Sequence, residues 1–94
     1  MMIININGVN YEVIKDDNNT CNEEQLKEMV TDYFLNYDYI VGDWSYNKLR
    51  LKGFNNKNNK NFNKINDYSK LDEYLENNCA YGCKYFVLKK LVEN

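Results

Sequence analysis

The sequence contains no histidine and no proline, and it has a single arginine and a single tryptophan. Without histidine the chain cannot build a Ser-His-Asp or Cys-His catalytic arrangement or an imidazole metal site. Its four glycines stand apart, at 8, 42, 53 and 82, so no glycine-rich loop is available to cradle a phosphate. We therefore expect no enzymatic activity, no cofactor and no small-molecule substrate.

Long apolar runs are also missing. No stretch approaches the roughly eighteen apolar residues of a membrane span, and the N-terminus lacks the charged and apolar regions of a secretory signal. The chain has 94 residues, a length typical of one domain with one core. These features predict a soluble cytoplasmic protein of one domain, residues 1–94, without a membrane partner.

Charge is distributed unevenly along the chain. Residues 1–43 hold nine acids and two bases, whereas residues 44–94 hold ten bases and five acids. Between 44 and 66 no acid occurs at all. Asparagine occurs eighteen times, which is typical of an AT-rich genome, so single Asn and Lys residues carry little information.

The first half of the sequence predicts a hairpin followed by a helix. Asn7-Gly8 lies between two β-forming runs and predicts a two-residue type I′ turn. Asn22 then begins an amphipathic helix of about fourteen residues, whose apolar positions recur at steps of three and four. These positions are Leu26, Met29, Val30, Tyr33, Phe34 and Tyr37.

The centre of the chain, residues 37–54, predicts a second hairpin. Leu49 and Leu51 alternate with three bases and are expected to face the core, whereas Lys48, Arg50 and Lys52 form a cationic row on the other face. An interior glycine marks a bulge or a close backbone approach, which we expect at Gly42 and Gly53. The side chain of Asp43 is expected to accept hydrogen bonds from backbone N–H groups of the turn.

The second half continues with a loop, a helix and a strand. Residues 55–66 are almost entirely Asn and Lys, and this composition predicts a mobile loop. Ser69 is expected to cap a second helix that ends near Asn77-Asn78, and 85–92 form the last strand. The order ββαββαβ predicts an α+β fold with a mostly antiparallel sheet and both helices packed on one face.

Cys79 and Cys83 are separated by three residues, and Cys21 is the only other thiol. A zinc site would need a carboxylate or water as a further ligand, so we expect a loop at a helix end in which thiols pack as small apolar groups, with Gly82 at the helix exit. We predict no metal; a metal site and a redox pair are the alternatives.

Three segments resemble a known family: 37–44 (YDYIVGDW), 49–54 (LRLKGF) and the region of Cys79, Gly82-Cys83 and 85–88 (YFVL). They resemble the YutD-like family of small bacterial proteins. The resemblance implies one α+β domain in the cytoplasm, and it brings neither an activity nor catalytic residues, because the family has no assigned function. Ser45 and Asn47 stand where we would expect glycine, although Asn tolerates a left-handed turn conformation.

The remaining functional signal is a surface on the central hairpin. Its candidate binding residues combine aromatic and basic side chains, as in protein hot spots. They are Trp44, Tyr46, Lys48, Arg50, Lys52 and Phe54. We predict a non-catalytic protein whose partner is another protein. The alternative is weak binding of single-stranded RNA by residues 48–64, where Lys57, Lys60 and Lys64 extend the basic row.

Overall fold

The computed structural model describes residues 2–16, 21–45, 47–78 and 84–91, which form one five-stranded sheet and two short α-helices. The strands are β1 (Met2–Ile6), β2 (Val9–Asp16), β3 (Tyr39–Ser45), β4 (Lys48–Phe54) and β5 (Tyr85–Lys90). The helices are α1 (Glu23–Met29) and α2 (Leu71–Asn78), with 3-10 helices η2 (Asp32–Asn36) and η3 (Tyr68–Lys70). The predicted order and α+β class are confirmed.

The sheet is antiparallel throughout and has the strand order β1-β2-β5-β3-β4. Both predicted hairpins are present. Asn7 and Gly8 have φ values of 54° and 90°, as a type I′ turn requires, and Asn47 has a φ of 63° at the tip of the β3–β4 hairpin. No helix in the described ranges is long and apolar enough to cross a membrane.

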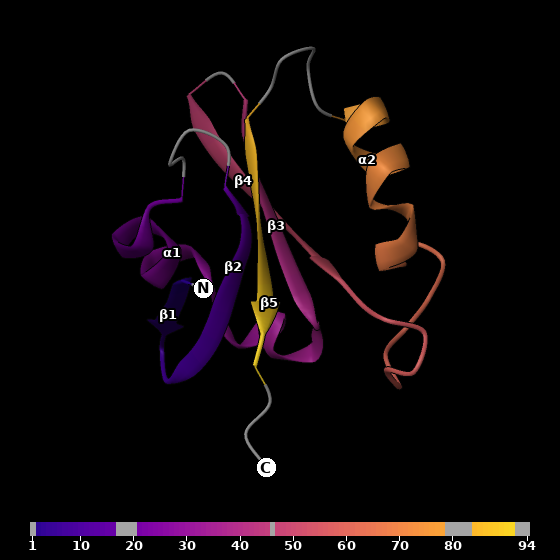
Figure 1. Ribbon diagram of the computed structural model, residues 1–94, viewed down its shortest axis with the longest axis horizontal. Coiled ribbons are helices and arrows are strands. Elements are labelled where there is room, and N and C mark those ends of the chain that lie inside the picture. The colour runs from indigo at the N-terminus through magenta and orange to yellow at the C-terminus, as the bar shows by residue number, and fades with distance from the viewer. Residues whose placement is uncertain (1, 17–20, 46, 79–83, 92–94) are drawn as a thin grey trace.

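The two helices lie on opposite faces of the sheet, so the prediction of one shared face is wrong (Figure 1). On the α1 face, Ile40, Phe86 and Leu88 pack with Leu26. On the α2 face, Tyr39, Val41, Phe54 and Val87 pack with residues of η3 and α2. The physical reason is that β3 and β5 are inner strands whose alternate side chains need cover on both sides.

The first helix is shorter than the expected fourteen residues. α1 ends after seven residues, at Met29, and Val30 is extended before η2 begins. The amide of Asn7 donates to the carbonyls of Lys27 and Val30, at 3.2 and 2.9 Å. The turn of the first hairpin therefore satisfies carbonyls at the end of α1, and a continued helix would need Val30 and Thr31, two β-branched residues.

A 3-10 turn, η3, precedes the second helix, and α2 itself begins at Leu71. Asp67, rather than Ser69, caps the helical segment, because its side chain accepts hydrogen bonds from the N–H and the hydroxyl of Ser69. The predicted end near Asn77-Asn78 is confirmed by the bounds of α2.

The Asn/Lys-rich segment 55–66 has more internal structure than its composition predicts. Its ends are joined by hydrogen bonds from Asn55 N–H to the Asn66 carbonyl at 2.6 Å and from Tyr68 N–H to the Asn55 carbonyl at 3.0 Å. Asn55 is fully buried, and its side-chain oxygen accepts from Asp38 N–H at 2.8 Å. Hydrogen bonds that involve asparagine therefore hold this segment in place of an apolar core. The mobility expected for the segment stays a prediction.

Aromatic rings pack directly against two glycines of the second hairpin. A Cβ at Gly42 would lie 2.2 Å from the Phe86 ring, and one at Gly53 would lie 2.2 Å from the Tyr37 ring. The β3–β4 register runs without a shift through both positions, so the expected bulge or backbone approach is wrong. Side-chain packing against the strand is what excludes a Cβ.

We predict that Gly42→Ala lowers the free energy of unfolding by about 2–3 kcal/mol, because the fully buried Phe86 ring has no room to withdraw. Gly53→Ala should cost less, since Tyr37 is only half buried and its ring can turn toward solvent. Urea unfolding of both variants beside the wild type measures this. A Gly42→Ala variant as stable as the wild type would show that the ring contact has no energetic consequence.

Candidate functional site

The basic row of the central hairpin lies on the α2 face of an edge strand. Asp43 and Arg50 are cross-strand partners in the β3–β4 register. Arg50 donates from Nε and Nη2 to the two carboxylate oxygens of Asp43, at 2.8 and 3.1 Å. This hydrogen bond, with the charge of Asp43, raises the pKa of Arg50 above its ordinary value.

Asp43 has only 2% of its surface exposed, so its negative charge depends on Arg50 for compensation. The side chain of Asp43 was expected to accept from backbone N–H groups of the turn, but it accepts from the guanidinium of Arg50 on the opposite strand. Arg50, which the sequence offers as a binding residue, is engaged within the hairpin.

Lys52 and Phe54 are also held against α2. The Lys52 ammonium lies 5.2 Å from the centre of the Phe54 ring and 5.7 Å from that of Tyr74, within range of cation–π attraction. Phe54 is 1% exposed and belongs to the core on this face. Lys48, near the hairpin tip, is exposed.

Trp44 lies on the other face of the same hairpin. It pairs with Leu49 in the register and packs, half buried, against the α1-side core. The structure therefore does not bring Trp44 together with Arg50, Lys52 and Phe54. Tyr46, Cys79, Gly82 and Cys83 lie outside the described residues, so the predictions made for them are not addressed by the structure.

The three loop lysines, Lys57, Lys60 and Lys64, are exposed on segment 55–66. This segment follows the end of β4 that is remote from the hairpin tip, and Figure 1 shows it at the opposite end of the sheet from that tip. The loop bases and Trp44 are thus separated along the hairpin axis. They do not form one continuous surface.

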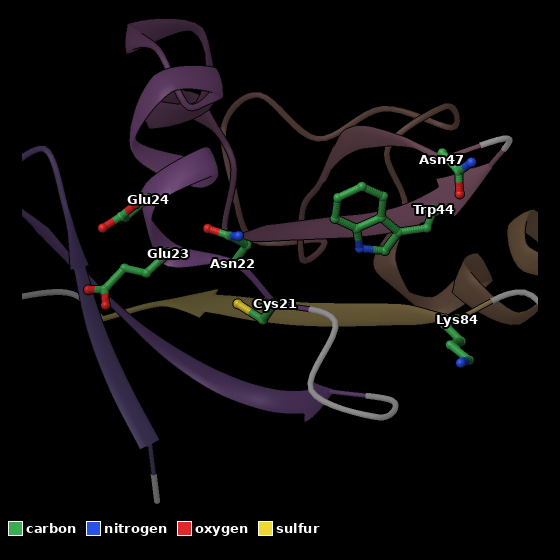
Figure 2. A pocket seen from close by; sticks show the side chains of 7 residues that line it. All are labelled: Cys21, Asn22, Glu23, Glu24, Trp44, Asn47 and Lys84. Carbon is green, nitrogen blue, oxygen red and sulfur yellow. The ribbon is translucent and has the colours of Figure 1, made fainter.

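A hollow of about 570 Å³ opens beside Trp44 on the α1 face. It is lined by Cys21, Asn22, Glu23, Glu24, Trp44, Asn47 and Lys84. Figure 2 shows Trp44 and Asn47 on the hairpin side and the two carboxylates on the α1 side, with Cys21 and Asn22 between them in this view. Three chain segments contribute to the lining. Of their residues, Trp44 alone was predicted from the sequence to take part in binding.

The local structure of this hollow follows from the start of α1. The side-chain oxygen of Asn22 accepts from Gln25 N–H at 3.0 Å and so caps the helix, as its sequence context predicts. The cap places Glu23 and Glu24 in the first turn, beside the hollow. With two carboxylates and the ammonium of Lys84, the lining carries a net negative charge.

Cys21 is the thiol of the hollow. Burial, followed by the charges of Asp16 and Glu23, raises its pKa to about 11. The thiol is therefore protonated near neutral pH and is a poor nucleophile. Among the described residues no group of three or more acidic or thiol side chains is placed to hold a metal ion. The metal prediction for Cys79 and Cys83 stays a prediction.

We predict that Arg50→Ala lowers the Tm by roughly 5–10 °C, because the buried Asp43 carboxylate loses its guanidinium. Lys48→Ala, two residues away on the same face and exposed, is the matched control and should leave the Tm nearly unchanged. Thermal unfolding followed by circular dichroism compares them. Equal losses in the two variants would contradict the structural role of the ion pair.

We predict that Cys21 reacts slowly with iodoacetamide in the folded protein. A pKa of about 11 leaves about a hundredfold less thiolate at pH 8 than an ordinary cysteine has. The rate should keep rising about tenfold per pH unit up to about pH 10, since the native thiol holds its proton there. Mass spectrometry of the Cys21 peptide reports this thiol alone. A plateau near pH 9 would contradict the raised pKa.

Comparison with known proteins places the chain among bacterial relatives. A model of the family described as "Putative antitoxin YutD-like" matches residues 5–89. A relative from Bacillus subtilis (strain 168), named "Putative antitoxin YutD", is 42% identical over 89 residues, which cover 95% of this chain and 98% of the relative. The solution NMR structure of B. subtilis yutD is similar with a TM-score of 0.78 at 40% identity, covering 100% of this chain and 87% of that one. The chain belongs to the YutD-like family, as its motifs predict.

Proposed function

We propose that this protein acts in the cytoplasm by binding another protein, without catalysis, and that the hollow beside Trp44 receives a side chain of the partner. The family description and the name of the B. subtilis relative both contain the word antitoxin. By extension, the partner of this chain is a toxin protein that the complex holds inactive. No cofactor takes part.

The hollow beside Trp44 is the observation that supports this proposal. Tryptophan is strongly enriched at binding hot spots, where an aromatic ring sits in a depression that excludes water. Here the indole is half buried against the core, which limits its freedom before a partner arrives. Glu23 and Glu24 at the far side add a negative charge, so the hollow suits an apolar or cationic side chain.

The chemistry of the lining favours binding over reaction. Among the described lining residues, the thiol of Cys21 is protonated near neutral pH and Lys84 supplies an ammonium. The chain has no histidine to act as a base near neutral pH. The other lining groups are the indole of Trp44, two carboxylates and two amides, which can orient a partner. These properties are those of a recognition surface.

The geometry does not favour the RNA alternative. Arg50 pairs with Asp43, and Lys52 lies over two rings, so neither presents an isolated charge to a phosphate. Trp44 lies on the opposite face from both and cannot stack a base beside them. RNA contact through 48–64 stays a prediction that steep salt dependence of binding would reveal.

We predict that Trp44→Ala abolishes recovery of a protein partner from native lysate. Loss of a hot-spot tryptophan typically weakens binding at least about thirtyfold. Glu24→Arg, an exposed change on the rim, should also lower recovery without touching the core. Tyr33→Ala is the matched aromatic control, because Tyr33 is 62% exposed and does not line the hollow.

The recovered partner then tests the antitoxin function directly. Its expression alone should arrest growth, and co-expression of this chain should restore growth, whereas the Trp44→Ala variant should not. Circular dichroism and thermal unfolding verify that each variant is folded. Equal recovery of the same proteins by wild type and both hollow variants would exclude the hollow as the binding site.

A further inference from the structure

The two edges of the sheet differ in chemistry. β4 forms one edge and carries Lys48, Arg50 and Lys52, the kind of charge that blocks pairing with another chain. β1 forms the other edge and reads MIINI, without a charge or proline, and it pairs with β2 without a register shift. Only the β4 edge carries the usual protection against strand pairing.

The outer backbone groups of β1 follow from the β1–β2 register. Asn5 pairs with Asn10, and the Asn10 carbonyl accepts from Leu91 N–H at 2.9 Å, on the side away from β1. The Asn5–Asn10 pair is therefore a non-hydrogen-bonded pair, in which the backbone groups of both residues point away from each other. The same alternation directs the N–H and C=O groups of Ile3 outward.

Both of these residues are accessible. Ile3 is 50% exposed, Asn5 is exposed, and Met2 beside them is 57% exposed. An added strand could form two hydrogen bonds with each outward residue, as in β-strand addition, and would cover these apolar side chains. The edge thus offers backbone pairing and apolar area together.

The charged residues around β1 indicate which kind of strand would bind at this edge. α1 contacts β1 and lies beside it in Figure 1. Its exposed residues include Glu23, Glu24 and Glu28 against Lys27, and on the other face Glu12 pairs with Ile3. A basic strand complements this surface. A second copy paired antiparallel through β1 would set two acidic α1 helices on the same face and is disfavoured.

We infer that β1 docks an extended segment of the protein partner in which apolar and basic residues alternate. This inference rests on the proposed function, because it assigns a second contact to the same partner. Backbone hydrogen bonds at Ile3 and Asn5 hold the segment. Because alternate side chains of a strand lie on opposite faces, its bases lie on the α1 face, toward Glu23, Glu24 and Glu28, and its apolar residues lie beside Ile3 on the other face.

The probe is a capped nine-residue peptide that alternates valine with lysine, titrated into ¹⁵N-labelled full-length protein. The amide signals of Ile3 and Asn5 should shift most, and their hydrogen exchange should slow at least tenfold. A peptide that alternates valine with glutamate should bind at least tenfold more weakly. Equal binding of the two peptides, or shifts centred elsewhere, would overturn the inference.

Ile3→Pro is the decisive variant. Proline removes the outward N–H of Ile3 without removing a β1–β2 hydrogen bond, so the fold should persist, and the lysine peptide should bind at least tenfold more weakly. Ile3→Val keeps the N–H and the branched shape and should bind as the wild type does. Dimers in sedimentation that Ile3→Pro dissolves would overturn the inference in favour of a second copy.

Trp44→Ala separates this inference from the proposed function, because it should leave peptide binding at β1 unchanged. If the peptide fails to bind while Trp44→Ala still abolishes partner recovery, strand docking is wrong and the proposed function stands. If the peptide docks at β1 but no partner is recovered, the edge is a docking site and the proposed function fails.

Discussion

The structure depends on the contact between the inner strands β3 and β5, where the Phe86 ring rests on Gly42. The two residues are partners in the register, and the ring occupies the space of a missing Cβ. Phe86, Ile40 and Leu88 face α1, and their neighbours Val41 and Val87 face η3 and α2. Because both faces of this strand pair are apolar, the domain needs two covering layers.

The two covering layers are held by different interactions. On the α1 face, apolar side chains of the helix enter the core, and the Asn7 amide joins the first hairpin to the end of α1. On the α2 face, aromatic rings dominate: Tyr39 and Tyr68 stack with centroids 3.6 Å apart. The Asn-rich segment that leads into this layer is tied to the sheet by amide hydrogen bonds through Asn55. In this segment, hydrogen bonds between polar groups take the place of apolar packing.

This division separates the two faces of the central hairpin in their availability for the proposed contacts. On the α2 side of the central hairpin, Arg50 pairs with Asp43 and Lys52 lies over aromatic rings, so these two bases contribute to the fold. The α1 side leaves a hollow beside Trp44 with acidic lining, and the β1 edge lies next to the same acidic helix. Both proposed contacts therefore favour a partner with basic and apolar side chains, which is consistent with the uneven charge of the sequence.

The sequence alone determined the secondary elements and their order, because these follow from local rules. The Asn7-Gly8 turn, the Asn22 cap and the alternation of Leu49 with Arg50 each act within a few residues. The family also followed from motifs within the chain. The placement of the helices on both faces was not predicted, although the apolar runs at 39–41 and 85–88 are typical of strands buried on both sides.

Only the tertiary structure decided which side chains meet. In the sequence, Arg50 has the pattern of a surface base, but in the structure Asp43 lies opposite it on the neighbouring strand. The sequence also groups Trp44 with Arg50, but the two side chains lie on different faces of the sheet. The hollow joins residues 21–24, 44, 47 and 84, which no local pattern connects. Asn55 and Asn66 look like solvated loop residues, yet both are buried. Composition reports the average solubility of a segment, whereas the partner of each polar group is set by contacts between distant parts of the chain.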